Sequence, residues 1–369
     1  MAPHPTTTQP SKSFRPLQAI MPVEWLIVGA ALVVWGLYHY LELPMPGQPG
    51  DKGPGGPFRF YLKQVYASFY LYALMFLGVV LGATWRMYLS PRSVSSSKVE
   101  VGTEATSTPQ RSLRALVTTI ARRFEPKECL YDARLLHCVV VMFVEFQLLK
   151  HLIPHLNPTL YDNQFSELER WICGTSCGHL LYTFLGSGAV RAASQHYTWY
   201  FPYMIGMVLV MLASVNRRLH HEYVLAFILL FLVGILWVYA IPTLGPTFYL
   251  PELYSFVRET ESGFLQQDLW GMREALAHDP LAKGVIFSIS GFPSLHVAVV
   301  LLGTLYAFRV HYHVGLLSSS FLLLIIHSTI ILGWHYVLDD VGSCFLVALC
   351  IWIARRFPWG EDAPLNDRA

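Results

Sequence analysis

Long runs of apolar residues dominate the hydrophobic pattern of this chain. Eight of these runs approach the length of a membrane span, because about 20 apolar residues cross a bilayer core of about 30 Å. The predicted spans are residues 23–42, 65–85, 135–153, 199–215, 223–241, 297–312, 315–333 and 341–354. The pattern therefore predicts an all-α polytopic membrane protein with about eight transmembrane helices.

The composition supports this class. Charged residues make up 14% of the chain, whereas soluble domains carry about 25%. No basic stripe of the kind that binds nucleic acid is present, so nucleic acid is not an expected partner. The polar N-terminal segment has no apolar region typical of a signal peptide. We therefore expect the first span to direct insertion.

The polar segments between the spans suggest how the chain is divided. Residues 1–90 are expected to hold an N-terminal tail and two additional transmembrane helices. Residues 91–134 are rich in serine and threonine and then basic, which predicts a flexible cytoplasmic loop. The six remaining spans form a unit over residues 135–354, and residues 355–369 form a cytoplasmic tail.

The distribution of lysine and arginine predicts the orientation, because short cytoplasmic loops carry an excess of both. Most of the 26 lysines and arginines lie on one side if the N-terminus is cytoplasmic. We therefore expect an integral protein of the plasma membrane with both termini in the cytoplasm. Two polar stretches, residues 290–296 and 333–340, then meet on the outside.

The first of these stretches, SGFPSLH (290–296), is a polar helix start at the end of an apolar span. Pro293 restricts the chain as it enters the helix, and Ser294 is a residue type that caps helices. Backbone N–H groups at a helix N-terminus attract an anion such as phosphate. His296 lies in the first turn, where its proton can reach the same anion.

The second stretch, WHYVLDD (334–340), holds His335 and Asp339 four residues apart. If a helix begins near His335, the two side chains lie on one face. A carboxylate beside an imidazole fixes its tautomer and stabilises the imidazolium. Together with His296 and the helix N-terminus, this pair indicates phosphoryl transfer, in which one histidine attacks phosphorus and the other protonates the leaving oxygen.

Other interpretations of these residues stay open. The spacing H-x3-D can be half of a metal site, but no H-E-x-x-H or C-x2-C spacing lies nearby, and we expect neither a metal nor a cofactor. Each histidine can also be an ordinary polar residue at a membrane boundary. Cys173 and Cys177 lie on the outer side, where a disulfide and two free thiols are both compatible with the spacing.

The motifs P-S-L-H (293–296) and S-T-x5-H-x3-D (328–339) resemble the second and third signature motifs of the type 2 phosphatidic acid phosphatase (PAP2) superfamily. The string GWHYVLDDVGS (333–343) is similar to that of the branch of inositol phosphorylceramide synthases. The segments LLKHLIPHLNPTLYD (148–162) and YAIPTLGPTFYLPELY (239–254) also look like loops of this branch. The resemblance covers roughly residues 135–353.

The resemblance implies a PAP2-like six-helix catalytic core with its site at the outer membrane face. His335 is then the nucleophile that forms a phosphohistidine, and Asp339 orients it. His296 is the acid toward the leaving group and the base toward the acceptor. Ser294, with Pro293 and the backbone around them, helps to bind phosphate, and no metal is required.

The chain departs from the phosphatases of this superfamily at two positions. It has no K-x6-R-P motif upstream on the outer side, and Thr329 stands where the third motif carries arginine, as is common in the synthase branch. Another cation is then expected to bind phosphate, and we favour Arg170 and Lys150 because they lie in the family-like loop. Alternatively, Lys150 extends toward the membrane boundary and Arg170 pairs with Glu167 or Glu169.

These residues predict a membrane lipid phosphotransferase that passes a phosphoryl-containing group from a lipid phosphate to a polar alcohol. With water as the acceptor, the same site is a lipid phosphate or pyrophosphate phosphatase. A non-catalytic transporter or scaffold of the same fold is the alternative from another class. The long outer segment 246–290 precedes His296 and is expected to cover the site.

Overall fold

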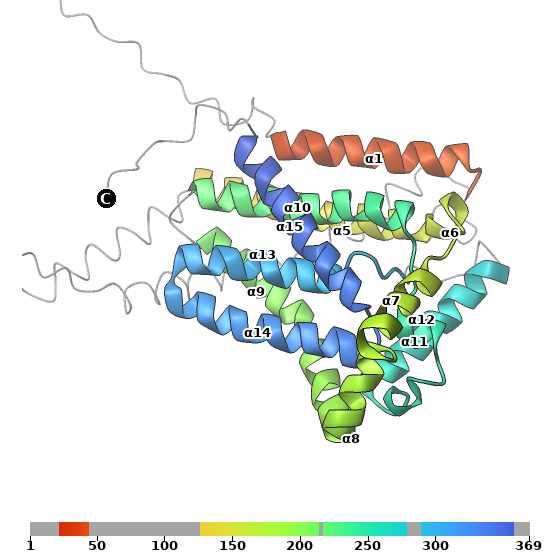
Figure 1. Cartoon of the computed structure of the whole chain (residues 1–369). Coiled ribbons are helices and arrows are strands. Elements are labelled where there is room, and N and C mark those ends of the chain that lie inside the picture. Colours follow the sequence, from red (N-terminus) through yellow and green to blue (C-terminus); the bar gives the residue numbers. More distant parts are fainter. Residues whose placement is uncertain (1–21, 44–125, 214–216, 279–288, 358–369) are drawn as a thin grey trace, which may run out of the picture.

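The structure is a computed structural model that describes residues 22–43, 126–213, 217–278 and 289–357 (Figure 1). All regular elements in these four ranges are helices. They are α1 (Pro22–Tyr40), α5 (Pro126–His151), α6 (Ile153–Leu156), α7 (Asp162–Cys173), α8 (Cys177–Thr198), α9 (Tyr200–Ala213), α10 (Arg217–Ala240), α11 (Pro246–Tyr249), the 3-10 helix η1 (Ser255–Val257), α12 (Glu261–His278), α13 (Leu295–Val310), α14 (Tyr312–Ile331) and α15 (Val337–Arg356). The predicted span 65–85 and most of the predicted loop 91–134 lie outside the described residues.

Four of the helices are long and apolar enough to cross a membrane. These segments are Val23–Tyr40, Arg218–Ala240, Tyr312–Ile331 and Val337–Arg356, in α1, α10, α14 and α15. Helix α13 is apolar but shorter, and α5 and α9 do not meet the same criteria of length and hydropathy. The membrane class is therefore supported, while the total of eight spans and the six-helix core stay predictions.

Helix α10 lies inside the bundle and packs against α5, α13 and α15. An unbroken run from Tyr223 to Phe231 is buried, as expected for a helix that is apolar on all sides. Phe231 meets Phe143 and Phe146 of α5 edge to face, with ring centroids 5.0 Å apart in both pairs. Figure 1 shows α5, α10, α13 and α14 running side by side, with α15 crossing them.

Helix α8 is broken at Gly186, whose φ of 73° lies in the left-handed region that favours glycine. A disulfide between Cys173 and Cys177 joins the end of α7 to the start of α8. The two cysteines therefore belong to different helices, which answers the question that their spacing left open. Figure 1 places α7 and α8 at the same end of the bundle as α11 and α12.

The segment after residue 246 packs on the turn that leads to α15. Thr247 donates its backbone N–H to the carbonyl of Gly333 at 3.0 Å, and Gln266 donates to the carbonyl of Leu332 at 2.9 Å. Tyr254 and Val257 are buried in one apolar cluster with Trp334. This segment therefore lies over the turn that carries His335, although residues 279–288 of the predicted cover are outside the description.

We expect Gly178→Ala to destabilise the fold. An added Cβ would lie 2.2 Å from the carbonyl oxygen of Ile330 and 2.4 Å from the hydroxyl of Tyr254. Such overpacking costs about 1–3 kcal/mol of unfolding free energy. The measurement is the thermal midpoint of the purified protein in detergent, followed by tryptophan fluorescence.

Gly188→Ala is the matched control, because a Cβ at this other glycine of α8 meets nothing within 4 Å. It should leave the midpoint unchanged or raise it slightly, since alanine is about 1 kcal/mol better than glycine inside a helix. Equal midpoints for the two variants would contradict the close packing of α8 on α14.

Candidate active site

The two predicted histidines lie next to each other at one end of the bundle. Nδ1 of His296 is 3.2 Å from Nε2 of His335, and Nδ1 of His335 is 3.2 Å from Oδ2 of Asp339. His335 is 4% exposed and Asp339 is fully buried. The structure thus assembles the three residues predicted to be catalytic, although 39 positions separate His296 from His335.

The contact between His335 and Asp339 does not arise from one face of a helix, as the spacing suggested. Helix α15 begins at Val337, so His335 lies before it. Asp339 is the third residue of the helix, and its Oδ2 accepts the backbone N–H of Tyr336 at 2.9 Å. The carboxylate therefore caps the helix and contacts the imidazole with the same oxygen.

Tyr197 of α8 extends this arrangement, with its hydroxyl 2.8 Å from Nε2 of His296. An ionised carboxylate only accepts hydrogen bonds, so we assign the Nδ1 proton of His335 to the bond with Asp339. Nε2 of His335 then accepts from Nδ1–H of His296, and Nε2 of His296 accepts from the tyrosine. The four groups form one hydrogen-bonded chain, in which the lone pair on Nε2 of His335 accepts from His296.

Sequence reasoning missed Tyr197 because its helix lies about 100 positions away from His296. Its ring stacks on Trp334 with the centroids 5.3 Å apart and the planes 9° apart. Trp334 directly precedes His335, so the same stack steadies both ends of the histidine pair. No sequence pattern marks this tyrosine among the 20 of the chain.

Ser294 joins the starts of α13 and α15. It is the N-cap of α13 and accepts the backbone N–H of Val297 at 3.4 Å, as the sequence predicted. Its own N–H donates to the backbone carbonyl of Asp339 at 3.2 Å, and its carbonyl accepts from the hydroxyl of Ser343 at 2.6 Å. Pro293 precedes it and follows Phe292 through a cis peptide bond.

Asp162, at the start of α7, supports the turn between His335 and α15. Its carboxylate accepts the backbone N–H groups of Leu244 and Gly245 at 2.9–3.0 Å and the hydroxyl of Tyr336 at 3.1 Å. Burial raises the pKa of this carboxyl, while the three donors act in the opposite direction. Asp162 therefore fixes the residue that directly follows His335.

Glu169 occupies the same face of α7, two turns later. Its carboxylate accepts the backbone N–H of Val337 at 2.9 Å, the hydroxyl of Ser176 at 2.8 Å and the N–H of Cys177 at 3.1 Å. Burial raises its pKa as well. A carboxylate bound to the first N–H of α15 stabilises that helix start, so α7 holds both sides of Tyr336.

The two cations that the sequence favoured differ in their placement. Lys150 is half-buried at the end of α5, with its Nζ 5.8 Å from the centroid of the Phe146 ring. It is a nearby positive charge for His296, with less effect on that ring than burial and His335 have. Arg170 is exposed on α7 and forms no ion pair with any described residue, so neither Glu167 nor Glu169 holds it.

Thr329, at the position where the phosphatases carry arginine, is fully buried. Its hydroxyl donates to the carbonyl of Ile326 at 3.0 Å. The carboxyl of Asp340 faces the hydroxyls of Thr329 and Ser294, and neither of its oxygens has a hydrogen-bond partner among the described residues. The site therefore presents a hydroxyl and a carboxyl where a guanidinium would otherwise bind phosphate.

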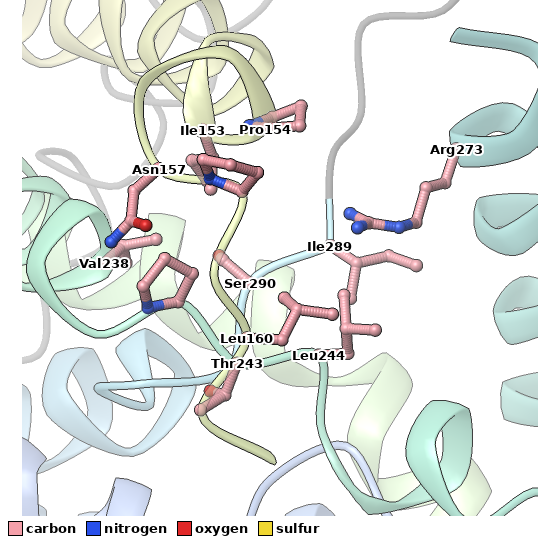
Figure 2. A pocket seen from close by; sticks show the side chains of 12 residues that line it. Ile153, Pro154, Asn157, Leu160, Val238, Thr243, Leu244, Arg273, Ile289 and Ser290 are labelled. Carbon is pink, nitrogen blue, oxygen red and sulfur yellow. The ribbon is translucent and has the colours of Figure 1, made fainter. Parts of the chain in front are cut away.

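A pocket lies beside the segment that leads into Pro293 (Figure 2). Thr243, on its wall, accepts the N–H of Gly291 at 2.7 Å and that of Phe292 at 2.8 Å. Arg273 of α12 is its one charged lining residue, and burial lowers the pKa of that guanidinium.

Within the four described ranges, no group of three or more histidine, cysteine or acidic side chains is placed to hold a metal ion.

Comparison with known proteins identifies the family of the chain. A family description of the PAP2 superfamily matches residues 163–353, which is slightly more than half of the chain. No curated protein and no solved structure matches the chain. The matched region contains His296, His335 and Asp339 and nearly all of α7, whose carboxylates support them. The chain therefore belongs to the PAP2 superfamily.

Proposed function

We propose that the protein is a metal-independent lipid phosphotransferase of the membrane that works through a phosphohistidine. Membership of the superfamily supports phosphatase or phosphotransferase chemistry in general. The observation that carries the proposal is the chain of contacts from His296 through His335 to Asp339. It supplies a nucleophile, a group that orients it and a second histidine for proton transfer.

In the first step, Nε2 of His335 attacks the phosphorus of a lipid phosphoester. The N–P bond forms and the P–O bond to the leaving group breaks. His296 is neutral in the resting arrangement, so it first takes up a proton from solvent as substrate binds. The imidazolium then gives its Nδ1 proton to the leaving oxygen, which departs as an alcohol. Asp339 stabilises the positive charge that develops on the ring of His335.

In the second step, neutral His296 takes the proton of the acceptor hydroxyl. The acceptor oxygen attacks phosphorus, the new O–P bond forms and the N–P bond breaks. His335 returns to its starting form and His296 is again protonated. An alcohol acceptor yields a new phosphoester or phosphodiester, and water yields free phosphate or a phosphomonoester.

Substrate must separate the two histidines before the first step. In-line attack needs roughly 3–3.5 Å between nitrogen and phosphorus, and the leaving oxygen lies beyond phosphorus with a hydrogen bond of about 2.8 Å to the acid. The two nitrogens are 3.2 Å apart in the resting site. We infer that the ring of His296 moves away by roughly 3 Å when a phosphoryl group enters.

Two features favour transfer to an alcohol over hydrolysis. The arginine of the phosphatases is replaced by Thr329, which lies beside the carboxyl of Asp340, and this pair suits hydroxyl groups better than a highly charged phosphomonoester. His335 and Asp339 are also buried and His296 is half-buried, which limits the access of bulk water. The proposed acceptor is a polar alcohol of the kind used by the inositol phosphorylceramide synthase branch, at the outer face of the membrane.

The reaction class is tested with purified protein in detergent and a panel of lipid phosphates, pyrophosphates and phosphodiesters, with EDTA present. Products are identified by mass spectrometry with and without inositol or a lipid alcohol. We expect a new phosphorylated product only when an acceptor is added. Release of phosphate that needs no acceptor would make the protein a phosphatase and would overturn the transferase proposal.

His335→Ala separates an enzyme from a non-catalytic protein of the same fold. We expect it to abolish product formation and to prevent the trapping of labelled phosphoryl groups on the protein in an acid-labile, base-stable form. His313→Ala, which changes an exposed histidine at the opposite end of the bundle, is the matched control. Equal activity of the wild type and His335→Ala would rule out the phosphohistidine mechanism.

Lys150 is the cation that we propose for phosphate binding. We expect Lys150→Gln to lower kcat/KM by about tenfold, which corresponds to about 1.4 kcal/mol of transition-state stabilisation. Arg170→Gln should change kcat/KM less than twofold because Arg170 is exposed on α7. Steady-state kinetics of both variants test which cation binds phosphate. A larger loss of kcat/KM for Arg170→Gln than for Lys150→Gln would assign phosphate binding to Arg170.

Tyr197→Phe tests the positioning of His296. The ring and its stack on Trp334 remain, while the hydrogen bond to Nε2 is lost. We expect kcat to fall about tenfold with KM unchanged, because the hydroxyl acts through His296 and not on substrate. Tyr182→Phe is the control, since Tyr182 lies in α8 like Tyr197 but its ring stacks on Phe256 of η1 and not on His296 or His335. Similar losses in both variants would contradict the role of Tyr197.

A further inference from the structure

A second polar cluster surrounds Glu222 of α10. Its side chain is 2% exposed and contacts an arginine from each of three helices. Arg309 of α13 is 2.6 Å from the carboxylate, Arg218 of α10 is 3.1 Å away and Arg355 of α15 is 3.9 Å away. Since α10, α13 and α15 pack on one another, the bundle itself gathers the three guanidinium groups.

The charges in this cluster do not balance. Among the described residues, Glu222 is the one carboxylate that these three arginines contact, so two positive charges remain. The arginine side chains keep 65%, 39% and 55% of their surface exposed for Arg218, Arg309 and Arg355. Each guanidinium has five N–H donors, and Glu222 uses few of them. The cluster therefore presents free donors and excess positive charge to its surroundings.

The buried side chain of Tyr306 holds Glu222 and Arg309 of this cluster in place. The hydroxyl of Tyr306 donates to Glu222 at 3.4 Å, and the guanidinium of Arg309 lies over the Tyr306 ring at 5.1 Å from its centroid. An arginine fixed in this way loses less conformational entropy when it binds a further anion. The cluster differs in this respect from isolated arginines on a membrane protein surface.

The cluster lies at the boundary of the proposed membrane region. Arg309 follows His296 by 13 positions on α13, which places it about 20 Å along the helix from the histidines. In Figure 1, the start of α10 and the ends of α13 and α15 lie at the end of the bundle away from α7 and α12. The distribution of lysine and arginine predicts that this end is cytoplasmic. Trp352, one turn before Arg356, is 52% exposed there, as is typical of membrane boundaries.

We propose that Arg218, Arg309 and Arg355 form a binding site for the phosphodiester of an anionic phospholipid, with Glu222 as the anchor that gathers them. Arginine binds phosphate oxygens through two parallel N–H donors. Lipid phosphates lie at the level of this boundary, and anionic lipids are enriched in the cytoplasmic leaflet. A zwitterionic lipid brings its own cation, so it is a poorer match for the excess charge. The site is separate from the histidines and does not depend on the proposed reaction.

The test compares the thermal midpoint of the full chain in detergent with added phosphatidylglycerol or phosphatidylcholine. Phosphatidylglycerol should raise the midpoint by roughly 3–5 °C, because a ligand that binds only the folded state stabilises it. Phosphatidylcholine should have little effect, and added salt should reduce the shift. Native mass spectrometry counts the bound lipid. Equal shifts with both lipids would show general solvation by lipid and would overturn the proposal.

The double variant Arg218→Gln with Arg355→Gln removes the two excess charges and keeps the closest pair, Arg309 with Glu222, so that the buried carboxylate retains a partner. We expect its midpoint without lipid to stay near that of the wild type and its response to phosphatidylglycerol to disappear. Arg191→Gln, which changes an exposed arginine of α8, should respond as the wild type does. An undiminished response of the double variant would also overturn the proposal.

Discussion

The hydrogen bonds between the start of α13 and the start of α15 are the contacts on which the candidate site depends. Ser294 donates to the carbonyl of Asp339, and Ser343 donates to both Ser294 and Asp339. Two helix starts, each with unpaired N–H groups, are thereby fixed side by side. His296 and His335 lie on these starts, so a change in this connection would move both rings at once.

Helix α7 and helix α8 complete the site from outside the two motifs. Asp162 and Glu169 bring two carboxylates into the protein interior, which is unfavourable unless each is hydrogen-bonded. Each carboxylate meets three donors, and these donors lie on the turn that carries His335 or on the neighbouring loops. The polar contacts that make burial of these acids possible are the same contacts that fix the turn after His335.

The resting site is closed, with the histidines in direct contact and Tyr197 behind them. The ring of His296 contacts Tyr197 on α8, a helix that is broken at Gly186. A displacement of this ring would therefore involve α8, which also packs on the segment 254–257. At the opposite end of α10, α13 and α15, the arginines around Glu222 form a separate polar cluster.

The sequence by itself determined the membrane class, the superfamily and the residues of the two motifs, because apolar runs and short spacings are local features. It also predicted Ser294 as a helix cap, for the same reason. Only the tertiary structure decided that Tyr197 contacts His296, that Asp162 and Glu169 hold the turn after His335, and that Cys173 and Cys177 belong to different helices. These contacts join segments up to about 170 positions apart, and no local pattern encodes which helices pack together. The start of α15 at Val337 depends on both kinds of contact, because Asp339 caps it locally and Glu169 of α7 binds its first N–H group.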